Sequence, residues 1–407
     1  MRVLTVGNSF PPQELGGGYE AVWSGAVRHL EARGDSVRVL TVDHLREPGL
    51  PESADAHREL RWYWRDHAYP RLSVHESLSI ERHNIRVFQR QLERFRPDVV
   101  SWWSMGGLTL SLLEIARRRD VPAVAFVHDD WLDYGRRADA WNRRARRRRY
   151  PPLLLERVLR VPGRIRFDLA AHYAFVSDTT RQHARKRGLD LPSTSVLHSG
   201  IEARFEPDRS ARQWSARLLY VGRIDPRKGV AIAIQAMEHL PDATLDIVGD
   251  GPPEHLAELA DIARRSAVED RVRFAGPVAP DDLPAVYRQA DAVIFPVLWS
   301  EPWGLVPLEA MASARPVVAT GRGGSGEYLV DGVNSLLYPR HEPARLADQV
   351  RRLATDAELR ARLIVAGMAT AKRFTADGFN RGVERALTEA LRRPGVPART
   401  RPCAPGS

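Results

Sequence analysis

The chain has 407 residues and a formal net charge of +10; 43% of its residues are hydrophobic and 28% are charged. This composition is typical of folded globular proteins and excludes general disorder. No apolar run approaches the roughly 20 residues needed to cross a bilayer, so no transmembrane helix is expected. The single cysteine, Cys403, excludes an intrachain disulfide and a cysteine-based metal cluster. Because the N-terminus has the pattern of a buried strand rather than a signal peptide, we expect a cytoplasmic protein.

Short β-rich runs alternate with helical patterns along the whole chain. In the first half we expect strands at residues 3–6, 36–42, 98–103, 123–127, 172–176 and 194–197, with helices at 19–32, 75–94, 108–118 and 179–187. In the second half we expect strands at 218–222, 244–249, 272–276, 292–297 and 316–319, with helices at 231–239, 253–264, 281–287 and 305–312. This alternation predicts an α/β protein with two doubly wound, Rossmann-like parallel-sheet domains that face each other across a cleft.

The domain boundary is expected in the polar stretch 202–215, which gives an N-terminal domain at 1–200 and a C-terminal domain at 201–374. A helix at 375–392 is expected to pack back on the first domain. Residues 393–407 are rich in Pro and Arg and are expected to be disordered. Residues 48–70 fall outside the alternation, and their tryptophans and tyrosines predict either acceptor stacking or ordinary packing in an insertion over the ligand face.

Ligands of doubly wound sheets bind beyond the carboxyl ends of the strands, so the loops at those ends are the candidate sites. After the first strand, three glycines at Gly16, Gly17 and Gly18 open a helix, and backbone N–H groups there can approach an anion. This signal is weak when taken alone. It is not a Walker loop, because no Gly-Lys-Ser/Thr follows.

Charged residues follow two strands of the second half. Arg223 and Lys228 follow the strand at 218–222, where an Arg fork and a Lys ammonium suit a diphosphate. Glu301 precedes a helix and Glu309 lies in its early turns, so both carboxylates can reach one ligand. Alone, the loop with Arg223 and Lys228 is more simply explained as a solvated charged loop. Together, the two loops predict a site for a phosphorylated, hydroxyl-rich ligand.

The combination of these motifs resembles the GT4 family of retaining glycosyltransferases, which have the GT-B fold. The resemblance rests on matching order and spacing over residues 218–339, and more weakly on Gly16–Gly18, His128-Asp129 and Ser177. One departure is Ser199-Gly200-Ile201-Glu202, where the family has Asn-Gly-Val-Asp. The matching segments are Gly222-Arg223, Arg227-Lys228-Gly229, Gly249-Asp250-Gly251-Pro252, Phe274 to Gly276, Glu301, Glu309-Ala310-Met311, Pro316 to Ala319, and Gly323-Gly324 with Glu327.

The resemblance implies catalytic roles for four positions. Arg223 and Lys228 match cations that hold the donor diphosphate and stabilise the leaving group. Glu301 matches a carboxylate that contacts hydroxyls of the donor sugar. His128 matches a histidine beside the anomeric centre, although by itself a histidine at a strand end is more often structural.

The resemblance also implies the nucleotide-binding positions. Glu309 matches the carboxylate that binds the ribose hydroxyls, and the base is expected near Gly251 and Val278. The backbone amides implied to contact the sugar or the phosphates are those of Gly16, Gly17, Gly304, Leu305 and Val306. The second domain is thereby implied to bind the nucleotide-sugar and the first to bind the acceptor.

The activity implied is transfer of a sugar, with retention, from a nucleoside-diphosphate sugar to a hydroxyl acceptor: a secondary metabolite, a polysaccharide intermediate or a lipid carrier. No cofactor is expected beyond this donor substrate. No Asp-x-Asp tripeptide occurs, and we expect transfer without a metal. The alternatives are another GT-B enzyme, such as a sugar-nucleotide epimerase or a phosphorylase, and a non-catalytic protein that binds a nucleotide or a membrane.

The densest basic run extends from Arg136 to Arg149. It is explained by a solvated face, by peripheral contact with an anionic membrane, or by an acidic partner, and a solvated face is preferred over the membrane. Binding to nucleic acid is not expected, because no recognised binding motif accompanies the charge.

Overall fold

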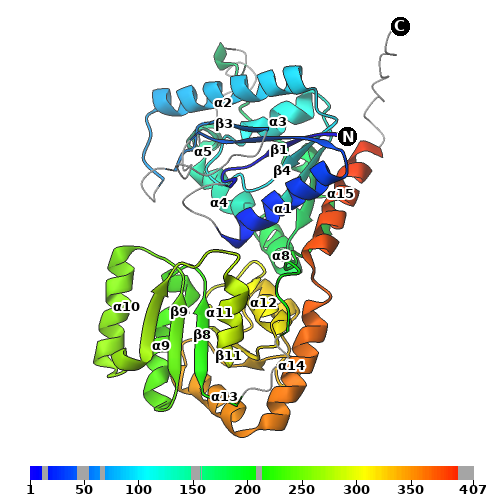
Figure 1. Ribbon diagram of the computed structural model, residues 1–407. Coiled ribbons are helices and arrows are strands. Elements are labelled where there is room, and N and C mark those ends of the chain that lie inside the picture. The colour runs from blue at the N-terminus through cyan, green and yellow to red at the C-terminus, as the bar shows by residue number, and fades with distance from the viewer. Residues whose placement is uncertain are drawn as a thin grey trace. The chain divides into compact units, whose positions relative to one another are not determined.

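The computed structural model describes residues 1–11, 17–43, 55–64, 69–147, 156, 158–207 and 213–392. The chain divides into two compact units (Figure 1). The first comprises Met1–Phe175, Arg181–Leu197 and Asn380–Ser407, and the second comprises Val176–Thr180 and His198–Phe379. The predicted site residue Gly16 and the tail predicted at 393–407 lie outside the described residues.

The first unit contains a seven-stranded, entirely parallel sheet in the order β3-β2-β1-β4-β5-β6-β7. Its strands are β1 Arg2–Val6, β2 Ser36–Val42, β3 Ala56–Leu60, β4 Val99–Trp102, β5 Ala123–Val127, β6 His172–Phe175 and β7 Thr194–Val196. The order reverses between β1 and β4, which makes this the topological switch point of the sheet. The interpretation of 48–70 as an insertion outside the pattern was wrong in part, because β3 is an edge strand that pairs with β2.

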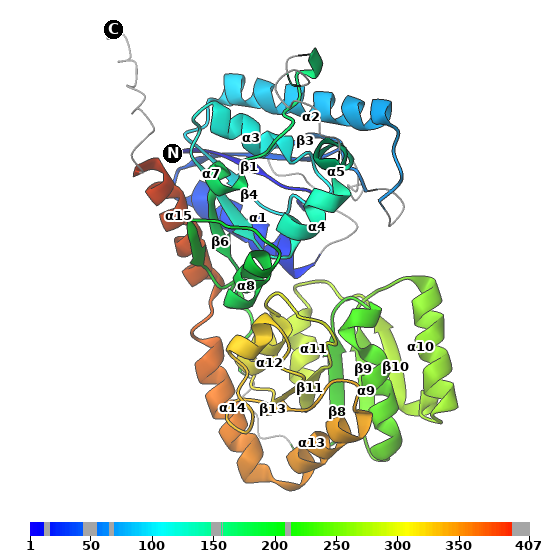
Figure 2. The same cartoon turned by 180° about the vertical axis from the view of Figure 1, so that it is seen from behind.

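Helices flank this sheet on both faces, as expected for a parallel sheet, whose strands are buried on both sides. Figures 1 and 2 show α2 and α3 on one face and α1 and α15 on the other. Glu384 of α15 forms ion pairs with His29 of α1, at 3.3 Å, and with Arg33. The helices are α1 Gly18–Ala32, α2 Val74–Phe95, α3 Ser111–Arg118, α4 Trp131–Ala138, α5 Ala140–Arg147, α7 Phe167–Ala170, α8 Asp178–Lys186 and α15 Ala376–Arg392.

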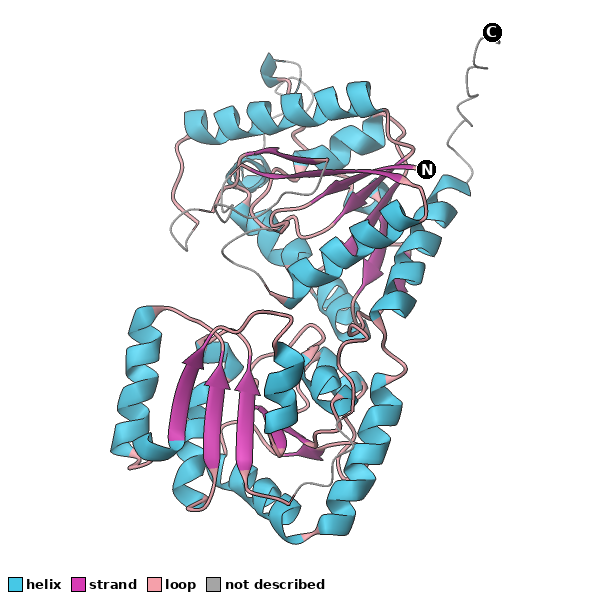
Figure 3. Ribbon diagram, viewed as in Figure 1, coloured by secondary structure: helices cyan, strands magenta, loops and turns pink. Residues whose placement is uncertain are grey.

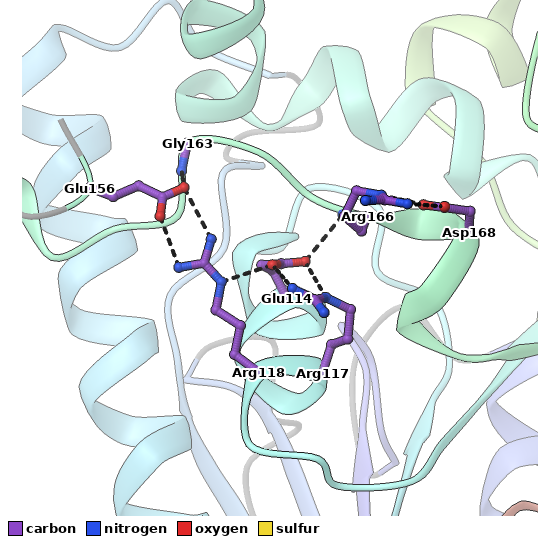
Figure 4. Close-up of polar contacts among 7 residues, drawn as sticks. All are labelled: Glu114, Arg117, Arg118, Glu156, Gly163, Arg166 and Asp168. Atoms are coloured by element: carbon purple, nitrogen blue, oxygen red, sulfur yellow. Dashed lines mark hydrogen bonds and ion pairs between the residues drawn. The ribbon is translucent and has the colours of Figure 1, made fainter. Parts of the chain in front are cut away.

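A buried carboxylate fixes the connection between β5 and β6 to α3 (Figure 4). The Glu114 side chain is only 2% exposed and accepts hydrogen bonds from Arg117, Arg118 and the backbone N–H of Arg166. Arg118 also donates two hydrogen bonds to the carboxylate of Glu156, at 2.8 and 3.1 Å, in a bidentate ion pair. Burial opposes ionisation of Glu114, but the hydrogen bonds from Arg117 and Arg118 hold its pKa below the usual value. These arginines therefore stabilise the fold rather than form a free basic surface.

A second buried acidic pair makes the first unit sensitive to pH. Glu81 and Asp139 are both inaccessible to solvent, and Glu81 Oε1 accepts a hydrogen bond of 2.7 Å from the Tyr63 hydroxyl. Burial raises the pKa of Glu81, and the charge of Asp139 raises it further. Burial likewise raises the pKa of Asp139 to about 6.

The shift of Asp139 predicts that the first unit loses stability as the pH rises from about 4 to about 6, and the raised pKa of Glu81 adds a further loss as Glu81 deprotonates. An acid with a higher pKa in the folded state deprotonates first in the unfolded state, so rising pH favours unfolding. Glu81→Gln is therefore expected to raise the unfolding temperature at pH 7 and to change it little at pH 4.5, as measured by thermal denaturation. Glu93→Gln, at a carboxylate 66% exposed, is the control. An equal effect of Glu81→Gln at both pH values would contradict this prediction.

The second unit contains a six-stranded parallel sheet in the order β10-β9-β8-β11-β12-β13, whose switch point lies between β8 and β11. Its strands are β8 Arg217–Val221, β9 Thr244–Val248, β10 Val272–Gly276, β11 Ala292–Phe295, β12 Val317–Ala319 and β13 Leu336–Leu337. Its helices are α9 Val230–Ala236, α10 Pro253–Arg265, α11 Leu283–Gln289, α12 Val306–Ala312, α13 Pro343–Thr355 and α14 Ala357–Ala371, with short 3₁₀ turns η1 Pro226–Lys228, η2 Met237–His239, η3 Glu269–Arg271 and η4 Gly324–Glu327.

Figure 3 shows this sheet between the helices of the second unit. A hydrophobic core lies on each face of the sheet. Leu218 and Tyr220 of β8 point into the core beneath α9, α10 and α13. Leu219 and Val221 point into the core beneath α11 and α12. This alternation follows from the two-residue period of a strand and fixes which loops emerge at the carboxyl edge.

Candidate functional site

The loops after β8 and β11 converge at the switch point of the second unit. Gly229 ends the β8 loop at φ 73°, and a Cβ there would lie 2.0 Å from the carbonyl oxygen of Pro296. The backbone N–H of Leu298 donates to the carbonyl of Arg227 at 2.8 Å. Only glycine allows both the left-handed backbone and this close approach. The two loops are therefore fixed against each other by their main chains.

This contact brings together two of the predicted catalytic residues. Lys228 Nζ lies 2.8 Å from Glu301 Oε2, and the two side chains are 16% and 12% exposed. The same carboxylate oxygen accepts a hydrogen bond of 2.7 Å from Trp299 Nε1. An almost buried carboxylate requires such partners, because desolvating an unpaired charge is costly.

Trp299 is in turn held by the β8 loop. The Arg227 guanidinium lies 4.6 Å from the centre of the Trp299 ring. Arg227 donates from two nitrogens to the two oxygens of Asp225, at 2.9 and 2.8 Å. The hydrogen bonds from Arg227 lower the pKa of Asp225 to about 2. A continuous chain of contacts thus runs from Asp225 through Arg227 and Trp299 to Glu301.

The pKa values of two buried tyrosines, Tyr220 and Tyr328, respond to the charged residues of the site. Burial raises the pKa of Tyr220, the charge of Glu301 raises it further and that of Arg223 lowers it. The Tyr220 hydroxyl also donates to the Arg223 carbonyl at 2.7 Å. Burial raises the pKa of Tyr328 in the same way, and there both Glu301 and Glu309 add to the increase. Glu301 therefore acts on both tyrosines, together with Arg223 at Tyr220 and with Glu309 at Tyr328.

Glu309 lies in the first turn of α12, where it accepts a 2.6 Å hydrogen bond from the Tyr287 hydroxyl of α11. Burial raises the pKa of Glu309, while the Tyr287 hydrogen bond and the charge of Arg204 lower it. Tyr287 leaves one carboxylate oxygen of Glu309 for other donors. A pair of vicinal hydroxyls is one such set of donors.

The predicted base-binding positions follow β9 and β10. Gly251 packs against the β8 loop, where a Cβ would lie 2.2 Å from the Ile224 carbonyl oxygen, and the Ile224 N–H donates to Asp250 at 2.7 Å. Val278 lines a pocket of about 230 Å³, formed with β8, β9, β10 and α11. Gly304, Leu305 and Val306 immediately precede or begin α12, beside Glu301. All predicted site residues of the second half therefore follow carboxyl ends of its strands.

The two described site residues of the first unit lie at the carboxyl edge of its own sheet. His128 follows β5, and its ring stacks on Trp103 with 5.4 Å between the centroids. Burial lowers the pKa of His128 to about 4, so its imidazole is neutral at pH 7. Gly17 precedes α1, and a Cβ there would lie 3.0 Å from a carboxylate oxygen of Glu20. An anion approaching Gly17 meets that negative charge.

The aromatic residues at 62–69 divide into two groups. Tyr63 is buried and serves packing through its contact with Glu81. Trp62 lies 4.8 Å from Trp64 between ring centroids and donates from Nε1 to the Gly106 carbonyl at 2.8 Å. Tyr69 is 42% exposed. In the second group, Trp62 and Tyr69 lie against Gly107 in the loop after β4.

Three residues that complete the site were not predicted. Trp299, Tyr287 and Tyr328 contact predicted residues from positions that carry no motif of their own. Trp299 lies two residues before Glu301, where an indole within a charged loop was the available signal. Within the described ranges, no three His, Cys, Asp or Glu side chains are grouped as metal ligands.

Two family models match the chain in succession. Residues 16–205 match Glycosyltransferase Family 4, and residues 215–356 match Glycosyl transferases group 1. The D-inositol 3-phosphate glycosyltransferase of Xylanimonas cellulosilytica is 34% identical over 217 residues, which are 51% of this chain and 50% of that protein. The glycogen synthase of Mycobacterium tuberculosis is 37% identical over 199 residues, or 47% of this chain and 46% of that protein. The chain spans about half the length of the curated relatives it matches.

Solved structures share the fold over nearly the whole chain. A sucrose-phosphate synthase from Thermosynechococcus elongatus superposes with a TM-score of 0.73 at 18% identity, covering 96% of this chain and 99% of that one. HepE from Anabaena, solved in complex with UDP and glucose, gives 0.68 at 20% identity, covering 96% and 100%. At these identities the likeness establishes the GT-B fold. The two family models and the fold together show that the chain belongs to the GT4 family of glycosyltransferases.

Proposed function

We propose that the chain transfers a sugar, with retention, from a nucleoside-diphosphate sugar to a hydroxyl acceptor. The observation that carries this proposal is the pairing of Lys228 with Glu301 at the β8–β11 switch point. At this point, beyond the ends of buried strands, Lys228 can bind a diphosphate and Glu301 can bind sugar hydroxyls. Glu309, eight positions after Glu301 in the chain, supplies the acceptor for ribose hydroxyls.

The proposed chemistry follows from the charge that develops in the reaction. The bond from the anomeric carbon to the phosphate oxygen breaks, and a bond from the acceptor oxygen forms on the same face of the sugar. Arg223 and Lys228 stabilise the negative charge on the departing diphosphate, which is a large term in such catalysis. The departing phosphate oxygen takes the proton of the acceptor hydroxyl. The neutral imidazole of His128 is proposed to lie beside the anomeric carbon as a hydrogen-bonding group rather than as a cation.

UDP-sugars are the first donors to test, because HepE is described in complexes with UDP and with UDP-glucose. We propose that the second unit binds the donor and that Trp62, Trp64 and Tyr69 of the first unit contact the acceptor. Purified protein is incubated with UDP-, GDP- and ADP-sugars, and slow hydrolysis of one donor is followed by NMR. A released sugar with the donor's anomeric configuration supports retention, and an inverted sugar refutes it. An epimerised nucleotide-sugar indicates an epimerase instead.

Transfer is expected to need no divalent metal, because cationic side chains are proposed to balance the diphosphate charge. Activity measured after dialysis against EDTA is expected to equal that of untreated protein within about twofold. Complete loss on chelation, restored by added Mg²⁺ or Mn²⁺, would contradict this prediction.

We also propose peripheral contact with anionic lipid through the first unit. Residues 1–200 carry 33 Lys and Arg against 24 Asp and Glu, whereas residues 201–407 carry 28 against 27. Not every arginine between Arg136 and Arg149 can bind lipid. Arg144 donates hydrogen bonds to Leu72, Ser73 and Ser77, and Arg136 lies 3.8 Å from Asp133. Exposed arginines at helical spacing continue along α2, at Arg82, Arg86 and Arg94. No described helix has the length and apolarity of a membrane span.

Sedimentation with liposomes tests this contact. Arg82→Gln/Arg86→Gln is expected to reduce binding to vesicles of phosphatidylglycerol and phosphatidylcholine at least threefold, because each basic residue near such a surface contributes about 1 kcal/mol. Arg351→Gln/Arg362→Gln on the second unit removes the same charge and is expected to leave binding unchanged. Equal binding to pure phosphatidylcholine vesicles would refute the proposal.

A further inference from the structure

Glu301 Oε2 holds two donors at once, and only one of them is available for the diphosphate. Lys228 Nζ lies 2.8 Å from this oxygen and Trp299 Nε1 lies 2.7 Å from it. Lys228 is the terminus of a long flexible side chain. Trp299 is a rigid ring whose face carries the guanidinium of Arg227 at 4.6 Å. Arg227 is itself tied to Asp225.

If Lys228 binds a phosphate oxygen of the donor, the diphosphate competes with Glu301 for the ammonium group and weakens its contact with Glu301. The Glu301 residue is 9% exposed, so water cannot fully replace the lost ammonium. The indole N–H remains in place, because its ring is fixed by Arg227 and by the main-chain contact between Leu298 and Arg227. The carboxylate then keeps one charge-assisted hydrogen bond and its orientation.

We propose that Trp299 is a positioning residue that holds Glu301 while Lys228 moves from Glu301 to the donor diphosphate. In the protein without donor, Lys228 is paired with Glu301. Glu301 therefore competes with the diphosphate for Lys228. Trp299 weakens that competition by stabilising the carboxylate after Lys228 leaves. This inference rests on the proposed function, because it assigns Lys228 to the diphosphate.

The proposal predicts opposite changes in UDP affinity for two variants. One removes the charge of Glu301, and the other removes the Trp299 hydrogen bond to it. Glu301→Gln removes the competitor of the diphosphate, so UDP without a sugar is expected to bind up to about tenfold more tightly. Trp299→Phe keeps the ring for Arg227 but removes the N–H, so Glu301 depends more on Lys228. UDP is then expected to bind about tenfold more weakly.

A double-mutant cycle measured by calorimetry separates this role from a structural one. Trp299→Phe is expected to weaken UDP binding in the wild-type background and to have little effect in the Glu301→Gln background. An equal loss in both backgrounds would mean that Trp299 supports the loop only, and would overturn the inference. Trp303→Phe is the matched control, since its indole N–H donates to the Ser199 carbonyl at 2.9 Å rather than to Glu301. It is expected to show no coupling to Glu301.

The same titrations distinguish a failure of this inference from a failure of the proposed function. GDP and ADP are titrated in parallel, and the cycle is run with whichever diphosphate binds the wild-type protein. If none of the three binds, the proposed donor site fails. If one binds and the two Trp299→Phe losses are equal, the donor site stands and the inference about Trp299 is refuted.

Discussion

Glu301→Gln is expected to lower kcat/KM for sugar transfer by about two to three orders of magnitude. An amide in place of the carboxylate cannot accept charge-strengthened hydrogen bonds from donor-sugar hydroxyls, and it leaves Lys228 without its donor-free partner. Loss of one preorganised polar group in such a site typically costs a factor of 10² to 10³. Initial rates with the donor identified in the screen measure the effect.

Two comparisons make this result specific. Glu258→Gln removes a carboxylate that is 64% exposed and pairs with His255, and it is expected to leave the rate unchanged. Circular dichroism and the unfolding temperature of Glu301→Gln show whether the fold is intact. A folded Glu301→Gln protein that transfers sugar at more than a third of the wild-type rate would exclude Glu301 from the reaction.

Gly323→Ala is expected to reduce activity about a hundredfold and to lower the unfolding temperature. Gly323 has φ 75°, and a Cβ at this position would lie 2.2 Å from the carbonyl oxygen of Glu301. The added methyl group must displace the Glu301 loop, and an error of about 1 Å in a reacting group has an effect of this size. Steady-state rates and thermal denaturation measure the two effects.

Gly332 provides a matched control, because it has φ 70° and no atom within 4 Å of an added Cβ. Gly332→Ala is expected to cost about 1–2 kcal/mol through backbone strain alone. Its activity per folded molecule is expected to match that of the wild type. If Gly323→Ala and Gly332→Ala have the same activity, the contact of Gly323 with the Glu301 loop has no functional importance.

Central strands were the most predictable part of the fold. Runs such as the one that forms β11 are apolar throughout, because strands of a parallel sheet are covered on both faces. β3 carries His57, Arg58 and Glu59 and is the edge strand of the sheet as far as the chain is described, so its composition does not indicate a strand. β13 has two residues, too few to show any periodicity.

The site was predictable where chemistry and spacing coincide in one segment. Glu301 and Glu309, eight positions apart in one segment, both lie at the start of α12 or just before it, as their spacing predicted. The contacts of Trp299 with Arg227 and Glu301 depend instead on how two loops, about 70 residues apart in the chain, fold against each other. Such contacts are set by backbone geometry at Gly229 and Gly323, which no local pattern in the sequence specifies.

A crystal structure of the chain with its nucleoside-diphosphate sugar tests the central claim most directly. We predict phosphate oxygens within hydrogen-bonding distance of Arg223 and Lys228, ribose hydroxyls on Glu309 and sugar hydroxyls on Glu301. Lys228 is predicted to have left Glu301, with the Trp299 hydrogen bond retained. A nucleotide-sugar bound elsewhere, or bound here with its phosphates away from both cations, would contradict the account.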